Sequence, residues 1–379
     1  MQPIRVLVVD DSVVIRRLVT GLLAEDPRIE VVGTAINGRA ALQKVAQFQP
    51  DLVTMDIEMP EMDGIEAVRR LRASGSRMPI IMFSTLTERG AVATLDALAA
   101  GASDYVPKPA NVGSVGRSME QVREALIPRI MSLVPRVFPR QADRPGAVAA
   151  PAARAAQAVT CRQPRQPAGG YRLLVIGSST GGPEAVNTLL ASLPPLPVPV
   201  ALVQHMPPLF TRQFAARLDR QFPFSVVEAG PDEALVPGKV VIAPGDHHLE
   251  VVAAAGGFRG RLTQGPPENY CRPAVDVLFR TAAQAAGGAV LSVVLTGMGS
   301  DGCKGAKVLV DAGGSVLAQD EATSVVWGMP GAVATAGLTE AVLPLKELAA
   351  EIMRRLSQPA LRSTGPVPVR TGGAAVTQR

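Results

Sequence analysis

A serine in the second half of the chain occupies a turn that could do nucleophilic chemistry. Ser179 lies in the stretch VIGSSTGGPEAV, between a β-branched run and residues that favour a helix. The run from Gly177 to Gly181 fits G-x-S-x-G, in which glycines let a sharp strand-to-helix turn expose the serine. Taken alone this pattern is weak, because turns of glycine and serine before a helix are common and usually structural.

Two phosphate-binding patterns fit the same turn less well. A dinucleotide-binding fingerprint, G-x-G-x-x-G, needs glycine where the chain has Ser179, and a Walker A loop ends in G-K-[ST], whereas Gly182 is followed by Pro183. No ribose-binding acid follows the next apolar run. We therefore interpret Ser179 as a candidate nucleophile.

A serine nucleophile needs a base, and a carboxylate must orient that base. His205 ends the apolar run PVALVQH, whereas His247 and His248 lie in a loop before a strand, so His205 is the better candidate. Asp301, in the glycine-rich stretch VLSVVLTGMGSDG, is the candidate acid. The glycines there also free main-chain N–H groups, so an oxyanion hole is expected around Met298. Taken singly, the histidine also fits an edge hydrogen bond and the aspartate a helix cap.

Polar residues also follow the apolar runs in the first third of the chain. They are Asp10, Asp11, Asp56, Ser84 and Lys108. In a doubly wound parallel sheet these positions converge at the carboxyl edge, where ligands bind. Three carboxylates repel one another, so Mg²⁺ is the natural partner, and a carboxylate beside Mg²⁺ and an ammonium can attack a phosphoryl group. Helix capping is the structural alternative for each acid.

The elements that must position these groups are alternating strands and helices. Five apolar runs, each followed by a helical pattern, predict a doubly wound five-stranded parallel sheet in residues 1–135. A larger, mostly parallel, Rossmann-like α/β domain is expected over residues 171–356. In it HLEVVAA and FRGRLTQ predict an antiparallel hairpin. Residues 136–170, rich in Pro, Ala and Arg, predict a flexible linker, and residues 357–379 a disordered tail.

The composition limits the function classes. The chain has 379 residues and a formal net charge of +5, but its basic excess gathers in the expected linker and tail, so the folded parts are slightly acidic. This argues against nucleic acid as a partner. No apolar run is long enough for membrane insertion. The three cysteines, Cys161, Cys271 and Cys303, fit neither a disulfide framework nor a metal knuckle, so a cytoplasmic location is expected.

The stretches VVDDS, TMDIEMPEMDGIE, IIMFST and GASDYVPKP resemble the receiver domains of two-component response regulators. The resemblance implies that Asp56 accepts a phosphoryl group. It implies a set of Mg²⁺ ligands, namely Asp10, Asp11, Asp56 and the main-chain carbonyl of Glu58. It also implies three residues that respond to phosphorylation, namely Ser84, Tyr105 and Lys108.

The stretches GSSTGGPEAV, VQHMPPLFT, VIAPGDHHLEV, RPAVDVLF, LTGMGSDG and VVWGMP resemble the catalytic domain of chemotaxis protein-glutamate methylesterases. That resemblance implies Ser179 as nucleophile, His205 as base, Asp301 as its partner and the Met298 amide in the oxyanion hole. It implies a hydrolase that releases methanol from methylated glutamates of methyl-accepting chemoreceptors, deamidates receptor glutamines, and needs no cofactor for the esterase reaction. The implied phosphodonor is the chemotaxis histidine kinase.

Two domains joined by a linker suggest how such an enzyme is regulated: the receiver covers the catalytic mouth until Asp56 is phosphorylated. The main alternative is a response regulator with another output, such as DNA binding. That output would need a small helical module with a basic recognition helix, whereas the second half here is a long α/β domain.

Overall fold

The computed structural model describes residues 2–108, 115–134 and 159–357. Its first part is a five-stranded sheet of parallel strands in the order β2-β1-β3-β4-β5. The strands are β1 Ile4–Val9, β2 Ile29–Ala35, β3 Leu52–Asp56, β4 Ile80–Ser84 and β5 Asp104–Pro107. The helices are α1 Val13–Ala24, α2 Gly38–Phe48, α3 Gly64–Ala73, α4 Glu88–Ala99 and α5 Val115–Leu133. The expected doubly wound receiver fold is confirmed.

The second part is built on a seven-stranded parallel sheet in the order β15-β14-β13-β6-β7-β10-β8. Its strands are β6 Leu173–Ser178, β7 Val200–Gln204, β8 Ser225–Glu228, β10 Lys239–Ile242, β13 Val290–Val294, β14 Ser315–Gln319 and β15 Ala341–Leu343. Its helices are α6 Gly182–Ala191, α7 Pro208–Gln221, α8 Val275–Ala286, α9 Cys303–Asp311, α10 Met329–Thr335 and α11 Leu345–Ser357.

A small antiparallel sheet accompanies the large one. The expected hairpin is present as β11 His248–Ala254 and β12 Gly257–Thr263, and β12 also pairs with β9 Asp232–Leu235. In the large sheet the strand order reverses between β6 and β13, and in the first sheet between β1 and β3. Ligands of open α/β sheets bind outside the carboxyl ends of the strands at such a reversal. Ser179 follows β6, and Asp10 follows β1, so both sets of candidate residues start from these points.

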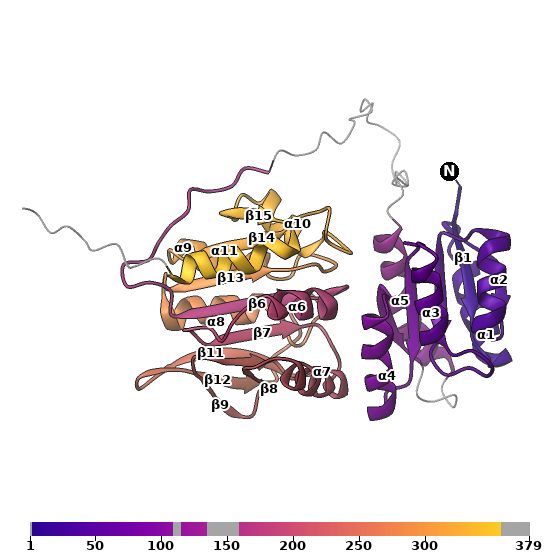
Figure 1. Ribbon diagram of the computed structural model, residues 1–379, viewed down its shortest axis with the longest axis horizontal. Coiled ribbons are helices and arrows are strands. Elements are labelled where there is room, and N and C mark those ends of the chain that lie inside the picture. The colour runs from indigo at the N-terminus through magenta and orange to yellow at the C-terminus, as the bar shows by residue number, and fades with distance from the viewer. Residues whose placement is uncertain (1, 109–114, 135–158, 358–379) are drawn as a thin grey trace, which may run out of the picture.

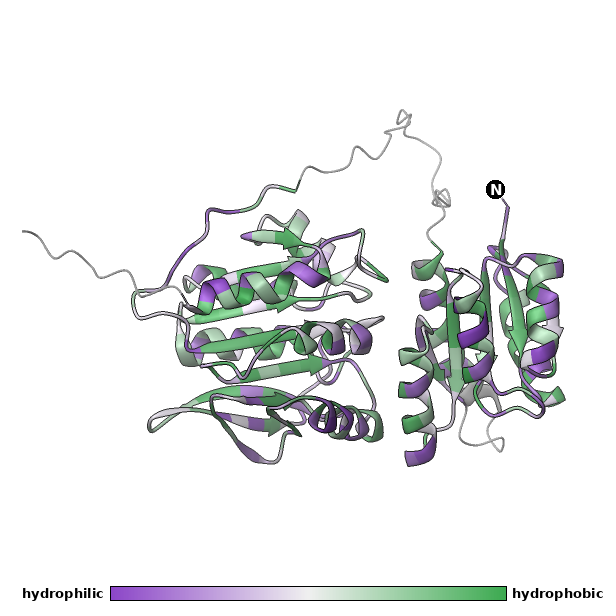
Figure 2. Ribbon diagram, in the orientation of Figure 1, coloured by the Kyte–Doolittle hydropathy of each residue, from purple (hydrophilic) through white to green (hydrophobic). Residues whose placement is uncertain are grey.

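Helices cover both faces of each sheet, because the strands are apolar on both sides (Figure 1, Figure 2). In the first part, α1 and α5 pack on one face and α2, α3 and α4 on the other. In the second, α6, α7 and α11 pack on one face, while α8, α9, α10 and the small sheet cover the other. These layers bury both sheets and leave their carboxyl edges for chemistry.

The two parts touch through α4, α5 and β5 of the first. Figure 1 shows α4 and α5 on the side that faces the second part. The ring of Tyr105 stacks on that of Phe210 in α7, with centroids 4.8 Å apart. Arg217 donates a hydrogen bond to Asp96 at 2.6 Å, which joins α7 to α4. Thr180, beside Ser179, donates to Asp104 at 2.7 Å. The first part therefore lies directly against the candidate active site.

The end of the expected linker lies along the second domain. The Arg162 N–H donates to the Thr339 carbonyl at 2.7 Å, and Tyr171 donates its hydroxyl to the Arg165 carbonyl at 2.7 Å. This differs from the expectation of a flexible segment throughout residues 136–170. The rest of that segment, up to residue 158, and the expected tail from residue 358 onward lie outside the described residues.

Candidate active site and phosphorylation site

The turn after β6 places Ser179 at the edge of the sheet, half-buried. The Ser179 N–H donates to the Thr296 carbonyl at 3.0 Å, and a Cβ placed on Gly297 would lie 2.8 Å from Ser179 Cβ. The left-handed residue of the turn is Gly181, with φ 74°, and Ser179 itself is not in that region. The serine is therefore presented by a glycine-dependent turn rather than by strain at the serine.

His205 and Asp301 meet beside this turn. The His205 N–H donates to the Ser178 carbonyl at 3.1 Å, which fixes the end of β7 against the end of β6. His205 Nε2 lies 2.8 Å from Asp301 Oδ2. Burial alone would raise the pKa of Asp301, but its interactions with His205 and with the N–H groups of Val275 and Asp276 together lower it. An ionised carboxylate therefore holds the imidazole, as a base in a catalytic triad requires.

The carboxylate of Asp301 is fixed by its neighbours in the fold. It accepts hydrogen bonds from the N–H groups of Val275 at 2.6 Å and Asp276 at 3.0 Å, at the start of α8. The Asn269 side-chain amide donates to Asp301 at 2.9 Å and to Asp276 at 2.9 Å. Burial raises the pKa of the Asp276 carboxyl. The amide of Asn269 thus bridges two buried carboxyl groups that would otherwise repel each other.

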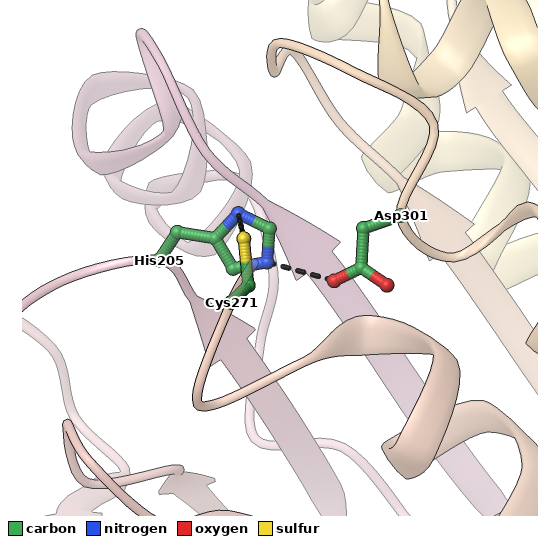
Figure 3. A group of neighbouring side chains, drawn as sticks. All are labelled: His205, Cys271 and Asp301. Atoms are coloured by element: carbon green, nitrogen blue, oxygen red, sulfur yellow. Dashed lines mark hydrogen bonds and ion pairs between the residues drawn. The ribbon is translucent and has the colours of Figure 1, made fainter. Parts of the chain in front are cut away.

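Cys271 also lies against the imidazole. Its Sγ is 3.5 Å from His205 Nδ1 and lies over the face of the ring, whereas Asp301 meets the ring at its edge (Figure 3). Burial would lower the pKa of His205, but all the interactions of the ring with Asp301 and Cys271 together outweigh burial and raise that pKa to about 10. Within the part of the chain that the structure describes, no hydrogen bond joins Ser179 to His205. The arrangement is thus a resting one, because the imidazole bonds to Asp301 and not to the Ser179 hydroxyl.

Met298 follows Gly297 in the turn after β13, next to Ser179. Its side-chain sulfur accepts a hydrogen bond from Ser132 of α5 at 3.4 Å, so this turn also touches the first domain. The proximity of Gly297 to Ser179 brings the main chain around Met298 beside this candidate nucleophile, where an oxyanion hole would be needed.

The acids of the first domain also converge. Oxygen atoms of Asp10, Asp11 and Asp56 all lie within 4.8 Å of one another. The Lys108 ammonium lies 2.9 Å from Asp10 and 2.7 Å from Asp56. The pKa of the Asp56 carboxyl is raised to about 6, mainly by burial and against the opposing effect of the Lys108 ammonium. Carboxylates gathered in this way are a donor set that suits Mg²⁺.

The remaining receiver candidates surround the same place. Asp11, Asp56, Glu58, Ser84 and Lys108 line a cavity of about 230 Å³, large enough for a phosphoryl group. The Ser84 hydroxyl donates to the Gly90 carbonyl at 3.1 Å and accepts from Thr94 at 2.6 Å. Tyr105 is separate from the cavity lining and lies in the contact with the second domain, where burial raises its pKa.

Several residues of the site have no distinctive mark in the sequence. Asn269 and Cys271 lie in a loop without periodic pattern, and Asp104 and Phe210 belong to the interface between the domains. Among these residues, only Cys271 has a signal in the sequence, because it directly precedes the stretch RPAVDVLF. Its neighbour in space, His205, is far away in the sequence, so spacing alone could not pair them.

Two family models match the chain, one in each domain. The response regulator receiver domain model matches residues 6–117, and the CheB methylesterase model matches residues 174–352. Within the described residues, no helix combines the length and the apolar character that crossing a bilayer requires.

Relatives are similar over nearly the whole chain. A Nocardioides sp. protein named protein-glutamate methylesterase/protein-glutamine glutaminase is 74% identical, covering 94% of this chain and 97% of its own. A Trichodesmium erythraeum protein of the same name is 46% identical, covering 94% and 100%. The crystal structure of the Thermotoga maritima CheB methylesterase catalytic domain is 41% identical, covering 49% of this chain and 98% of its own, with a TM-score of 0.48.

Proposed function

Because this chain belongs to the protein-glutamate methylesterase/protein-glutamine glutaminase family, with a receiver domain ahead of the methylesterase domain, we propose that it hydrolyses glutamate methyl esters on chemoreceptors. The same site deamidates specific receptor glutamines. The observation that carries this proposal is the 2.8 Å contact between His205 and Asp301 beside the turn of Ser179. A DNA-binding output is not supported, since the second domain matches the methylesterase model.

In the proposed reaction, Ser179 Oγ attacks the γ-carbonyl carbon of the methylated glutamate. His205 takes the serine proton and passes it to the departing methoxide, so methanol leaves, and the main-chain N–H of Met298 stabilises the oxyanion. Water activated by His205 then hydrolyses the acyl-enzyme to a receptor carboxylate. Since Asp301 occupies Nε2, the serine proton passes to Nδ1 of the neutral ring.

The receiver domain supplies the regulation. Asp56 accepts the phosphoryl group, and Asp10, Asp11, Asp56 and the Glu58 carbonyl are the residues that would hold Mg²⁺. The metal, when bound, neutralises charge on the transferring phosphoryl oxygens. Lys108 already pairs with Asp10 and Asp56, so it is placed to respond to a new negative charge at Asp56. The proposed phosphodonor is a chemotaxis histidine kinase, in a cytoplasmic setting that fits the three free cysteines.

Occlusion links the two domains in this proposal. In the unphosphorylated state, the receiver domain restricts the approach of a receptor helix to Ser179. It is held there by three contacts, namely Asp104 with Thr180, Tyr105 with Phe210, and α5 with Met298. Phosphorylation weakens this contact and shifts the population toward an open form.

Replacement of the nucleophile tests the proposed function. In Ser179→Ala, methanol release from methylated receptor should fall by about 10³-fold or more, because the covalent route is lost. Glutamine deamidation should fall with it, while phosphorylation at Asp56 persists. Ser192→Ala, a change in an exposed serine at the end of α6, is the matched control and should keep the full rate. Retained methanol release in Ser179→Ala would remove the assignment.

A further inference from the structure

His248 is a buried histidine to which the proposed esterase reaction gives no role. Its Nδ1 accepts a hydrogen bond from the main-chain N–H of Ala274 at 3.2 Å, and its Nε2 lies 3.0 Å from the Pro266 carbonyl. Because a main-chain N–H only donates and a carbonyl only accepts, the ring carries its proton on Nε2. Both nitrogens are therefore taken, so this ring is not available as a base for Ser179.

The two partners of the ring lie near the two ends of one loop. Pro266 lies near the start of the segment between β12 and α8, and Ala274 directly precedes α8. Between them lies Asn269, whose amide donates to Asp301. His248 itself is the first residue of β11 and pairs with β12, so the small sheet holds its backbone. The imidazole thus ties both ends of this loop to a strand.

The N–H that His248 accepts is the first of three successive N–H groups at the start of α8. The next two, of Val275 and Asp276, donate to Asp301 at 2.6 and 3.0 Å. The first N–H groups of a helix have no partner within it, and Ala274 has no side-chain acceptor that could cap them. His248 supplies one acceptor and Asp301 the other, so the two side chains hold the same short stretch of backbone.

We propose that His248 is a positioning residue of the esterase, whose Nδ1 holds the start of α8 and thereby keeps the Asp301 carboxylate in place against His205. Water cannot replace this acceptor, because His248 is 2% exposed and Ala274 is 0% exposed. Without the acceptor, the buried N–H of Ala274 has no partner, which is unfavourable. The start of α8 can relieve this only by moving, and Asp301 then loses its fixed position.

Two substitutions separate the roles of the two ring nitrogens. In His248→Asn, the side-chain oxygen takes the place of Nδ1, so the acceptor for Ala274 remains and the donor to Pro266 is lost. In His248→Gln, the longer side chain places its amide near the position of Nε2, so the donor remains and the acceptor is lost. Each variant loses one hydrogen bond, so a role in stability alone predicts the same result for both.

Steady-state methanol release from methylated receptor measures the effect on the reaction. We expect kcat of His248→Gln to fall about 3- to 10-fold, with KM little changed, because the substitution acts on Asp301 and not on the receptor. His248→Asn should keep most of its rate. His247→Gln is the matched control: its half-buried ring lies 3.3 Å from the Gly245 carbonyl, and its loss should leave kcat unchanged. No loss of kcat in His248→Gln, or an equal loss in His248→Asn, would overturn the proposal.

The effect on rate rests on the proposed esterase function, whereas the effect on Asp301 is measured without substrate. The chain has three histidines, so isotopic labelling of the histidine nitrogens gives NMR signals from three rings. The Nε2 signal of His205, which reports its hydrogen bond to Asp301, should shift in His248→Gln and stay in place in His248→Asn. An unchanged signal in His248→Gln would contradict the proposal. If the unaltered protein released no methanol, the proposed function would fail, while these signals would still decide the role of His248.

The same spectra give a measurement on the unaltered protein alone. The ring of His248, assigned through its bonds to the backbone, should show a protonated Nε2 and an unprotonated Nδ1. A proton on Nδ1 would mean that Ala274 has no acceptor there. That result would rule out the proposal even if neither variant of His248 folded.

Discussion

At the residue scale, the chemistry of the site depends on how firmly Asp301 is held. Its carboxylate accepts from His205 and from three main-chain N–H groups, of Val275, Asp276 and Gly302. Besides His205, one other side chain donates to this carboxylate, namely the amide of Asn269 at 2.9 Å. Asn269 has φ 51°, in the left-handed region that asparagine tolerates better than most residues. It is therefore a positioning residue whose side chain can be tested apart from the main chain.

Asn269→Gly removes the amide and leaves a residue that accepts the same φ. We expect kcat for methanol release to fall about tenfold with little change in KM. The reason is that a hydrogen bond to a charged group contributes about 1.5–3 kcal/mol, of which this partly exposed bond gives the lower end. Steady-state kinetics on methylated receptor measures the effect.

Tyr270→Gly is the matched control for Asn269→Gly. Tyr270 lies in the same loop with φ 63°, but its side chain is fully exposed. Glycine there makes the loop equally permissive without touching Asp301, so kcat should stay near the unaltered value. Equal losses in both variants would show that loop flexibility, rather than the amide, sets the rate.

At the scale of elements, the turn between β6 and α6 presents Ser179, the proposed nucleophile, and Gly181 makes that turn possible. Gly181 has φ 74°, and a Cβ there would lie 2.5 Å from Val325 Cγ2. Gly181→Ala should therefore suffer both backbone strain, of about 1 kcal/mol, and a clash with a β-branched side chain. We expect a lower melting temperature and at least a tenfold loss of methanol release, about 1.4 kcal/mol in the barrier.

Gly238 separates the two causes. It has the same φ of 74°, but a Cβ there would meet nothing within 4 Å. Gly238→Ala should show only the strain, which lowers the free energy of unfolding by about 1 kcal/mol and leaves the esterase rate unchanged. Urea denaturation of both variants measures the difference, and the argument fails if Gly238→Ala is the more destabilised.

Periodicity was enough to predict most elements, because a buried parallel strand is an apolar run whatever its neighbours are. The five strands of the receiver sheet and the hairpin of β11 and β12 follow from it. Strand β9, DEAL, begins with two acids at the edge of the small sheet, and β15 has three residues, so neither has a recognisable pattern. Strand ends also identified Ser179, His205 and Asp301, whereas Cys271 and Asn269 come from a loop whose path only tertiary structure fixes.

At the scale of the whole molecule, the proposed occlusion depends on a small contact between two folded domains. Its centre is apolar, with Tyr105 stacked on Phe210. Its edge includes the ion pair between Asp96 of α4 and Arg217 of α7, at 2.6 Å, with both side chains partly exposed. Such a pair contributes about 0.2–1 kcal/mol to the stability of the domain contact. A contribution of this size is small enough for phosphorylation to reverse the occlusion.

Removal of either partner should therefore raise the basal rate of the unphosphorylated enzyme. For Arg217→Ala and for Asp96→Ala we expect about 1.5- to 5-fold faster methanol release, the rate equivalent of that pair energy. The double variant should be no faster than either single one, because one interaction is lost in all three. The rate of the phosphorylated enzyme should not change, since the contact is already open there.

The control for this cycle lies on the same helix. Arg212 of α7 lies 3.5 Å from Glu228, within the second domain, so Arg212→Ala removes a cation from α7 without touching the receiver. Its basal rate should equal that of the unaltered protein. If Arg212→Ala is activated as strongly as Arg217→Ala, the charge of α7 acts on the substrate rather than on the domain contact. If the effects of Arg217→Ala and Asp96→Ala multiply in the double variant, the ion pair has no part in occlusion.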